Sequence, residues 1–183
     1  MIGSKKNVNI FLMMNQMIKN NFQEYFMNEY ELLVSEVQKK APVIETDLFQ
    51  NTGCYGLYRD GRIYIEKSLS LVEKRNVLAE ELGHHDTSFG DILNQDCLEN
   101  RKQELKARQY ALEQLVTLDD LIKCSESGFS NHYTCAEFLG VDVETLKNVL
   151  AYYRQKFGDT YFYKGRIFEF NDLSVMILNT NLQ

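Results

Sequence analysis

The chain has 183 residues, of which 44% are hydrophobic and 25% charged, and this is ordinary for a soluble globular protein with a sizeable core. Its formal net charge of −6 gives it no general electrostatic attraction to nucleic acid or to an anionic membrane. The four cysteines contain no C-x-x-C pair, so we expect reduced thiols in a cytoplasmic protein. A Cys-based metal site at Cys124, His132 and Cys135 is the alternative, although three ligands at irregular spacing indicate it only weakly.

The first 26 residues differ in character from the rest of the chain. Their interrupted apolar run over residues 8–14 is too short to span a bilayer, and no signal-type cleavage site follows it. We therefore expect residues 1–26 to be an N-terminal extension: an extra helix, a disordered arm or an artefact of the chosen start site. A single domain is expected over residues 27–183, and it opens with a helix whose apolar side chains fall at i, i+3, i+4 and i+7: Tyr30, Leu33, Val34 and Val37.

A β-hairpin is predicted over residues 55–66, with Asp60-Gly61 at its turn. Directly after it, Ser70 and Glu73 match the S-x-x-E capping box that begins a helix. At 3.6 residues per turn, the apolar residues of this helix share one side that should face the sheet: Leu71, Val72, Leu78, Ala79 and Leu82.

The opposite side of the same helix carries Glu80 and His84, which are one helical turn apart and therefore neighbours. The next predicted helix, residues 99–116, places Glu104 on a face of small apolar residues: Ala107, Ala111 and Leu115. Because alanines let another helix approach closely, we expect Glu104 to be presented to the preceding helix rather than to water.

These residue types match the needs of a catalytic metal site, which keeps three protein ligands and one open position. Glu80, His84 and Glu104 are the candidate ligands, and Glu81, one residue further along, is the candidate general base. An exposed helix face with the pairs Glu80–His84 and Glu81–His85 explains the same string without any metal.

Three blocks in order carry a resemblance to a known family: "GLYRDGRIYIEKSLSLVEKRNVLAEELGHHDTSFGDI", "ENRKQELKARQYA" and, more loosely, "AEFLGVDVETLKNVLAYYRQKFG". They resemble the ImmA/IrrE family of metallo-endopeptidases, especially members on prophages and other mobile genetic elements. The resemblance implies an α+β, minimal zincin-like fold, in which a short antiparallel sheet packs on a metal-bearing helix.

The resemblance also implies roles for the candidate residues. Glu81 matches the catalytic glutamate, His84 the second motif histidine and Glu104 the downstream acidic ligand, while Glu80 replaces the first histidine. One divalent metal is expected, with zinc first; a carboxylate at Glu80 makes the site harder, so manganese or iron competes better. His85 lies about 100° around the helix from His84 and is expected beside the metal site unless the helix ends there.

The implied function is cleavage or inactivation of a helix-turn-helix repressor, which derepresses genes of the mobile element. The alternative is a non-catalytic antirepressor that only binds this repressor. The C-terminal subregion, about residues 130–170, has the outline helix–turn–helix followed by a hairpin with Lys164-Gly165 at its turn. This subregion has no excess of basic residues that could bind nucleic acid, so we expect the repressor as partner and neither DNA nor a membrane. The sequence does not indicate an oligomeric state.

Overall fold

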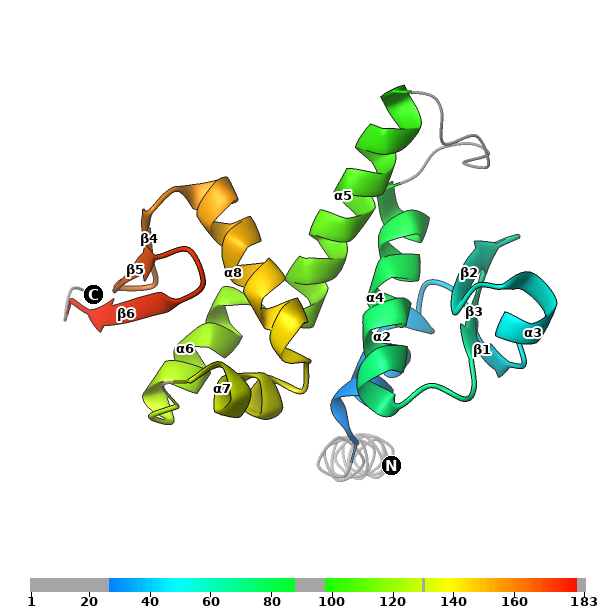
Figure 1. Ribbon diagram of the computed structural model, residues 1–183, viewed down its shortest axis with the longest axis horizontal. Helices are drawn as coiled ribbons and strands as arrows, with labels where there is room; N and C mark the ends of the chain where they lie inside the picture. The colour runs from blue at the N-terminus through cyan, green and yellow to red at the C-terminus, as the bar shows by residue number, and fades with distance from the viewer. Residues whose placement is uncertain (1–26, 88–97, 130, 181–183) are drawn as a thin grey trace, which may run out of the picture.

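The computed structural model describes residues 27–87, 98–129 and 131–180. Two long helices, α4 (Leu71–Thr87) and α5 (Leu98–Leu115), lie side by side and run in opposite directions in the middle of the molecule (Figure 1). A small sheet lies on one side of this pair, and a group of helices with a second small sheet lies on the other (Figure 1). The predicted extension, residues 1–26, lies outside the described residues.

The first sheet is built from β1 (Val43–Thr46), β2 (Gly56–Arg59) and β3 (Arg62–Glu66) in the order β1-β3-β2. The β2–β3 hairpin is confirmed, and its turn residues Asp60 and Gly61 have φ angles of 51° and 72°, which the tight two-residue turn requires. The antiparallel sheet that the resemblance implies is correct for β2 and β3 but not for β1, which pairs with β3 in parallel. Strand β1 was missed since its four residues show no clear alternation.

Helices α2 (Glu29–Val37) and α4 (Leu71–Thr87) cover this sheet, while the short α3 (Phe49–Thr52) precedes β2. The capping box at the start of α4 is confirmed: the Ser70 N–H donates to Glu73 over 2.8 Å, and the Glu73 N–H donates to the Ser70 hydroxyl over 3.3 Å. The shared core consists of apolar side chains from sheet and helices: Tyr30, Val37, Ala41, Ile63, Ile65, Leu78 and Leu82. The predicted core positions Leu71 and Val72, in the first turn of α4, are instead exposed.

Helix α5 (Leu98–Leu115) packs along α4 through the predicted small-residue face. Ala107, Ala111 and Leu115 are all buried there. The contact is so close that a Cβ atom on Gly83 would lie 2.3 Å from the backbone oxygen of Ala107. Glycine in α4 and alanine in α5 therefore bring the two backbones together.

The C-terminal part consists of α6 (Leu118–Glu126), α7 (His132–Leu139), α8 (Val143–Phe157) and a second sheet. Its strands β4 (Thr160–Tyr163), β5 (Arg166–Phe170) and β6 (Val175–Asn179) are antiparallel in the order β4-β5-β6. The Lys164-Gly165 hairpin is confirmed, whereas β6 was not predicted. Helices α7 and α8 are joined by a short turn with Gly140 at φ 64°, and the prediction of a helix-turn-helix segment stays a prediction.

Arg75 joins the two parts of the molecule. Its buried guanidinium, on α4, donates to the Leu139 and Gly140 carbonyls at the end of α7 over 2.7 and 2.9 Å, and to the Leu115 carbonyl at the end of α5 over 2.9 Å. Two of these hydrogen bonds fix the helix with the candidate site to the end of α7, and the third fixes it to the end of α5. Among the described residues, we find no helix with both the length and the apolar character needed to cross a membrane.

Candidate metal and catalytic site

The close α4–α5 contact brings His84 and Glu104 together. The Nε2 atom of His84 lies 3.6 Å from a carboxylate oxygen of Glu104, and the other Glu104 oxygen accepts a hydrogen bond from Arg108 Nε over 2.9 Å. Both His84 and Glu104 are partly exposed, with 22% and 37% of their side-chain surface accessible. The prediction that Glu104 faces the preceding helix is therefore confirmed. Its role as a metal ligand stays a prediction.

Glu80 lies one turn before His84 on α4 and retains exposed surface. The surrounding protein nevertheless desolvates its carboxyl and raises its pKa, and the negative charge of Glu104 adds to this, while Arg108 and His84 act in the opposite direction. Glu80, His84 and Glu104 therefore share one electrostatic environment, in which two carboxylates face one imidazole and one guanidinium.

Glu81 occupies a different position, between α4 and the edge strand β2. A Cβ atom on Gly56 of β2 would lie 2.5 Å from a Glu81 carboxylate oxygen, so only glycine leaves room for this carboxyl. Burial raises the pKa of Glu81 to about 7, and the charges of Glu80 and Glu104 act in the same direction. The backbone N–H of Tyr58 donates to the Glu81 carboxylate and limits the increase.

His85 does not join His84, because α4 continues to Thr87 instead of ending early. Its Nδ1 atom lies 2.7 Å from Asp86, and its ring meets the edge of Tyr58 with centroids 5.2 Å apart. Asp86 also accepts hydrogen bonds from Lys40 and Tyr110, each over 2.6 Å. Although burial raises the pKa of Asp86, these three hydrogen bonds outweigh it and lower that pKa to about 2.

The sequence analysis missed this network beside the candidate site. Lys40 precedes Asp86 by 46 residues, and Tyr110 follows it by 24. No spacing rule connects positions so far apart, and only the packing of α4 on both neighbours brings them together. Asp86 itself follows the two histidines directly, so an acidic residue beside a histidine was the one available signal.

The donor types at the site fit a divalent metal ion, since carboxylate and imidazole groups are common ligands of zinc, manganese and iron. His84 Nε2 faces Glu104, while its Nδ1 atom is buried and has no hydrogen-bond partner within the described residues. In the same part of the chain, no group of three or more His, Cys, Asp or Glu residues is arranged to hold a metal ion. Two of the predicted ligands, His84 and Glu104, therefore lie close together, whereas Glu80 does not complete a group of three with them.

The Cys-based alternative is likewise not arranged to hold a metal ion in the part of the chain that the structure describes. Cys124, His132 and Cys135 line one pocket, but they too form no such group among the residues described. His132 begins α7 rather than lying in a loop, and its Nε2 atom contacts the Leu173 carbonyl. Cys54, Cys124 and Cys135 are free thiols, and Cys97 lies outside the described residues.

Residues 37–150, more than half of the chain, match the model of the IrrE N-terminal-like domain, which is a peptidase family. The chain belongs to this family. The match confirms the resemblance inferred from the sequence, and it covers α4 and α5 with all four candidate site residues. In this IrrE-like chain, the match ends within α8, so the second sheet lies beyond it. Neither a curated protein nor a solved structure matches the chain significantly.

Proposed function

We propose that this chain is a metal-dependent endopeptidase that cleaves or inactivates a helix-turn-helix repressor and so derepresses genes of a mobile element. The proposal depends chiefly on one observation: His84 and Glu104, from different helices, approach within 3.6 Å beside the partly buried carboxyl of Glu81. Membership of a peptidase family supports the catalytic part. The repressor as substrate, and a cytoplasmic place of action, follow from the ImmA/IrrE resemblance.

We assign the metal to Glu80, His84 and Glu104. A bound divalent ion would polarise the scissile carbonyl and favour ionisation of the attacking water. Zinc is the first candidate, and manganese or iron competes because two of the three ligands are carboxylates. Arg108 holds one oxygen of Glu104, over 2.9 Å, and leaves the other directed at His84.

Glu81 is the proposed general base. Its carboxyl is oriented by the Tyr58 N–H and lies against Gly56, so it is fixed at the edge of the first sheet. From there it would take a proton from the attacking water and pass it to the leaving amine. Desolvation of this carboxyl beside the negative charges of Glu80 and Glu104 costs folding free energy, and such a cost is typical of catalytic groups.

The test is coexpression of the full chain with candidate helix-turn-helix repressors, followed by immunoblotting and mass spectrometry of the fragments. We expect cleavage by the wild type and none by Glu81→Gln, whose far-UV circular dichroism should be unchanged. Glu137→Gln is the matched control, because Glu137 is an exposed carboxylate on α7, and it should cleave normally. Cleavage by Glu81→Gln at the wild-type rate would refute the assigned mechanism.

The non-catalytic antirepressor remains a second candidate, because Glu80 replaces a histidine and no three-donor group is assembled among the described residues. It predicts relief of repression without fragments and no effect of Glu81→Gln. Measuring reporter expression and repressor length in the same cells separates the two: an intact repressor with full derepression would favour binding alone.

A further inference from the structure

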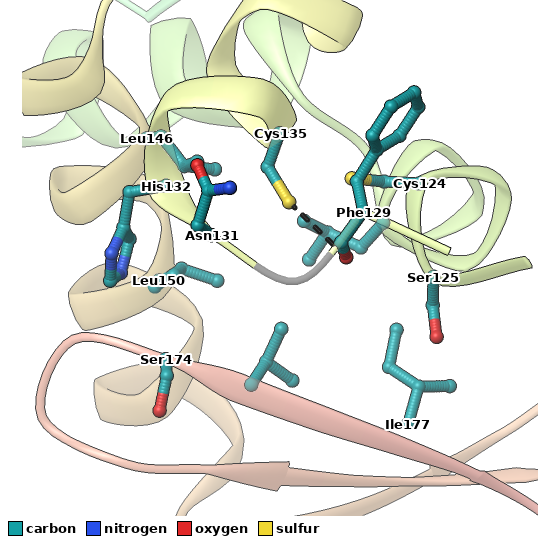
Figure 2. Close-up of a pocket in the computed structure, with 12 residues that line it drawn as sticks. Cys124, Ser125, Phe129, Asn131, His132, Cys135, Leu146, Leu150, Ser174 and Ile177 are labelled. Carbon is teal, nitrogen blue, oxygen red and sulfur yellow. Dashed lines mark hydrogen bonds between the residues drawn. The ribbon is translucent and has the colours of Figure 1, made fainter. Parts of the chain in front are cut away.

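A pocket of about 120 Å³ lies in the C-terminal part, apart from the α4–α5 site. Helices α6, α7 and α8 and strand β6 surround it, and Figure 2 shows Cys124 and Cys135 on its wall near Phe129. Much of the remaining lining is apolar: Leu121, Leu146, Leu150, Val175 and Ile177. Two thiols from different helices therefore meet in a largely apolar space that the proposed peptidase chemistry does not use.

The two thiols line the same pocket but differ in access. Cys124 is 3% exposed, whereas Cys135 is half-buried. Cys135 Sγ donates to the Phe129 carbonyl over 3.6 Å, and Cys135 lies near enough to Cys124 to affect the pKa of its thiol. Burial, followed by the effect of Cys135, raises the pKa of Cys124 to about 12, so this thiol stays protonated. An oxidant entering the pocket would therefore meet Cys135 first.

We propose that Cys124 and Cys135 are a redox modification site, at which hydrogen peroxide converts the two thiols into a reversible disulfide between α6 and α7. The Cys135 sulfur attacks one peroxide oxygen, the O–O bond breaks, and Cys135 becomes a sulfenic acid as one water leaves. The Cys124 sulfur then attacks the Cys135 sulfur, forming the S–S bond, and the displaced hydroxyl leaves as a second water with the Cys124 proton. The protein loses two electrons, and the peroxide gains them.

The surroundings favour this reaction over metal binding. His132 also lies on the pocket wall, but its Nε2 atom contacts the Leu173 carbonyl instead of the thiols. The apolar walls protect a sulfenic acid from further oxidation until the neighbouring thiol reacts. The crosslink would join α6 to α7, and α7 ends at the carbonyls that Arg75 of α4 holds. This inference does not depend on the proposed peptidase activity.

The sequence allows a direct test on the full chain. Lys123 and Lys147 flank both cysteines with no lysine or arginine between them, so trypsin releases the pair in one peptide. The protein is treated with hydrogen peroxide, alkylated with iodoacetamide and digested. We expect this peptide to be unalkylated and two hydrogen atoms lighter than its reduced form. Chymotryptic cleavage between the cysteines should leave two pieces joined until dithiothreitol separates them.

Two variants make the test specific. Cys54→Ser removes an exposed thiol elsewhere and should leave the disulfide unchanged, whereas Cys135→Ser should abolish it while Cys124 remains alkylatable after denaturation. Because Cys124 is buried, Cys124→Ala is checked for folding by circular dichroism before it is compared. The inference is overturned if both thiols stay alkylatable at a peroxide dose that oxidises Cys54. It is equally overturned if Cys135 proceeds to the sulfinic acid while Cys124 stays reduced.

Discussion

Replacing Gly83 by alanine should separate the two helices that carry the candidate site. The new Cβ atom would lie 2.3 Å from the Ala107 backbone oxygen, whereas carbon and oxygen normally approach to about 3.3 Å. A backbone oxygen within a helix cannot rotate away as a side chain can. The α4–α5 distance must therefore grow by about 1 Å near the contact between His84 and Glu104.

The expected loss of stability follows from two opposing terms. Overpacking a close contact costs about 1–3 kcal/mol, and the clash with a rigid backbone atom puts Gly83→Ala in the upper part of that range. Exchanging glycine for alanine inside a helix returns about 1 kcal/mol. We therefore expect a net loss of about 1–2 kcal/mol in the free energy of unfolding, and a metal affinity at least about tenfold lower because Glu104 is displaced.

Urea unfolding of the metal-free protein and competition with a chromophoric chelator measure these two effects separately. Asn148→Ala is the control, since this substitution at an exposed position on α8 raises helix propensity without creating a clash. Unchanged stability together with unchanged metal affinity in Gly83→Ala would refute the reasoning that close backbone contact positions Glu104.

Two further predictions concern the framework of the site. Arg75→Leu should lower the free energy of unfolding by about 3 kcal/mol, because three carbonyls, two of them in buried hydrogen bonds, lose their partner; the same change at the exposed Arg62 should cost little, and equal urea midpoints would contradict this. Glu66 has its pKa lowered from 4.5 to about 2, first by the Phe49 backbone N–H and then by Ser68. Its stabilising effect should be complete above pH 4.5 and disappear as the pH falls toward 2. The urea midpoints of wild type and Glu66→Gln should therefore differ at neutral pH and converge in acid, and a constant gap would be the contrary result.

Local signals predicted much of the fold. Both hairpins were found because Asp60-Gly61 and Lys164-Gly165 adopt the positive φ angles that tight turns need. The start of α4 was found because its capping box is local. In contrast, the parallel pairing of β1 with β3 depends on contacts between segments that are distant along the chain, so no local signal indicated it, and the resemblance implied an antiparallel sheet instead.

At the candidate site, too, features with a local sequence signal were predicted and features that depend on long-range packing were not. The small-residue face of α5 predicted that Glu104 meets α4, and the Gly83–Ala107 contact is the physical reason. The hydrogen bonds of Lys40 and Tyr110 to Asp86 had no sequence signal, since their spacing depends on how three elements pack. Leu71 and Val72 were placed in the core because helical periodicity gives the direction of a side chain and not whether another element covers it.

Metal content per chain, measured by elemental mass spectrometry on untagged protein after reconstitution with zinc, manganese or iron, tests the central claim most directly. We predict close to one divalent ion per chain in the wild type and in Glu81→Gln, and its loss in Glu104→Gln, with far-UV circular dichroism the same in all three. A chain that binds no metal under any of these conditions, or that keeps its metal in Glu104→Gln, would contradict the account.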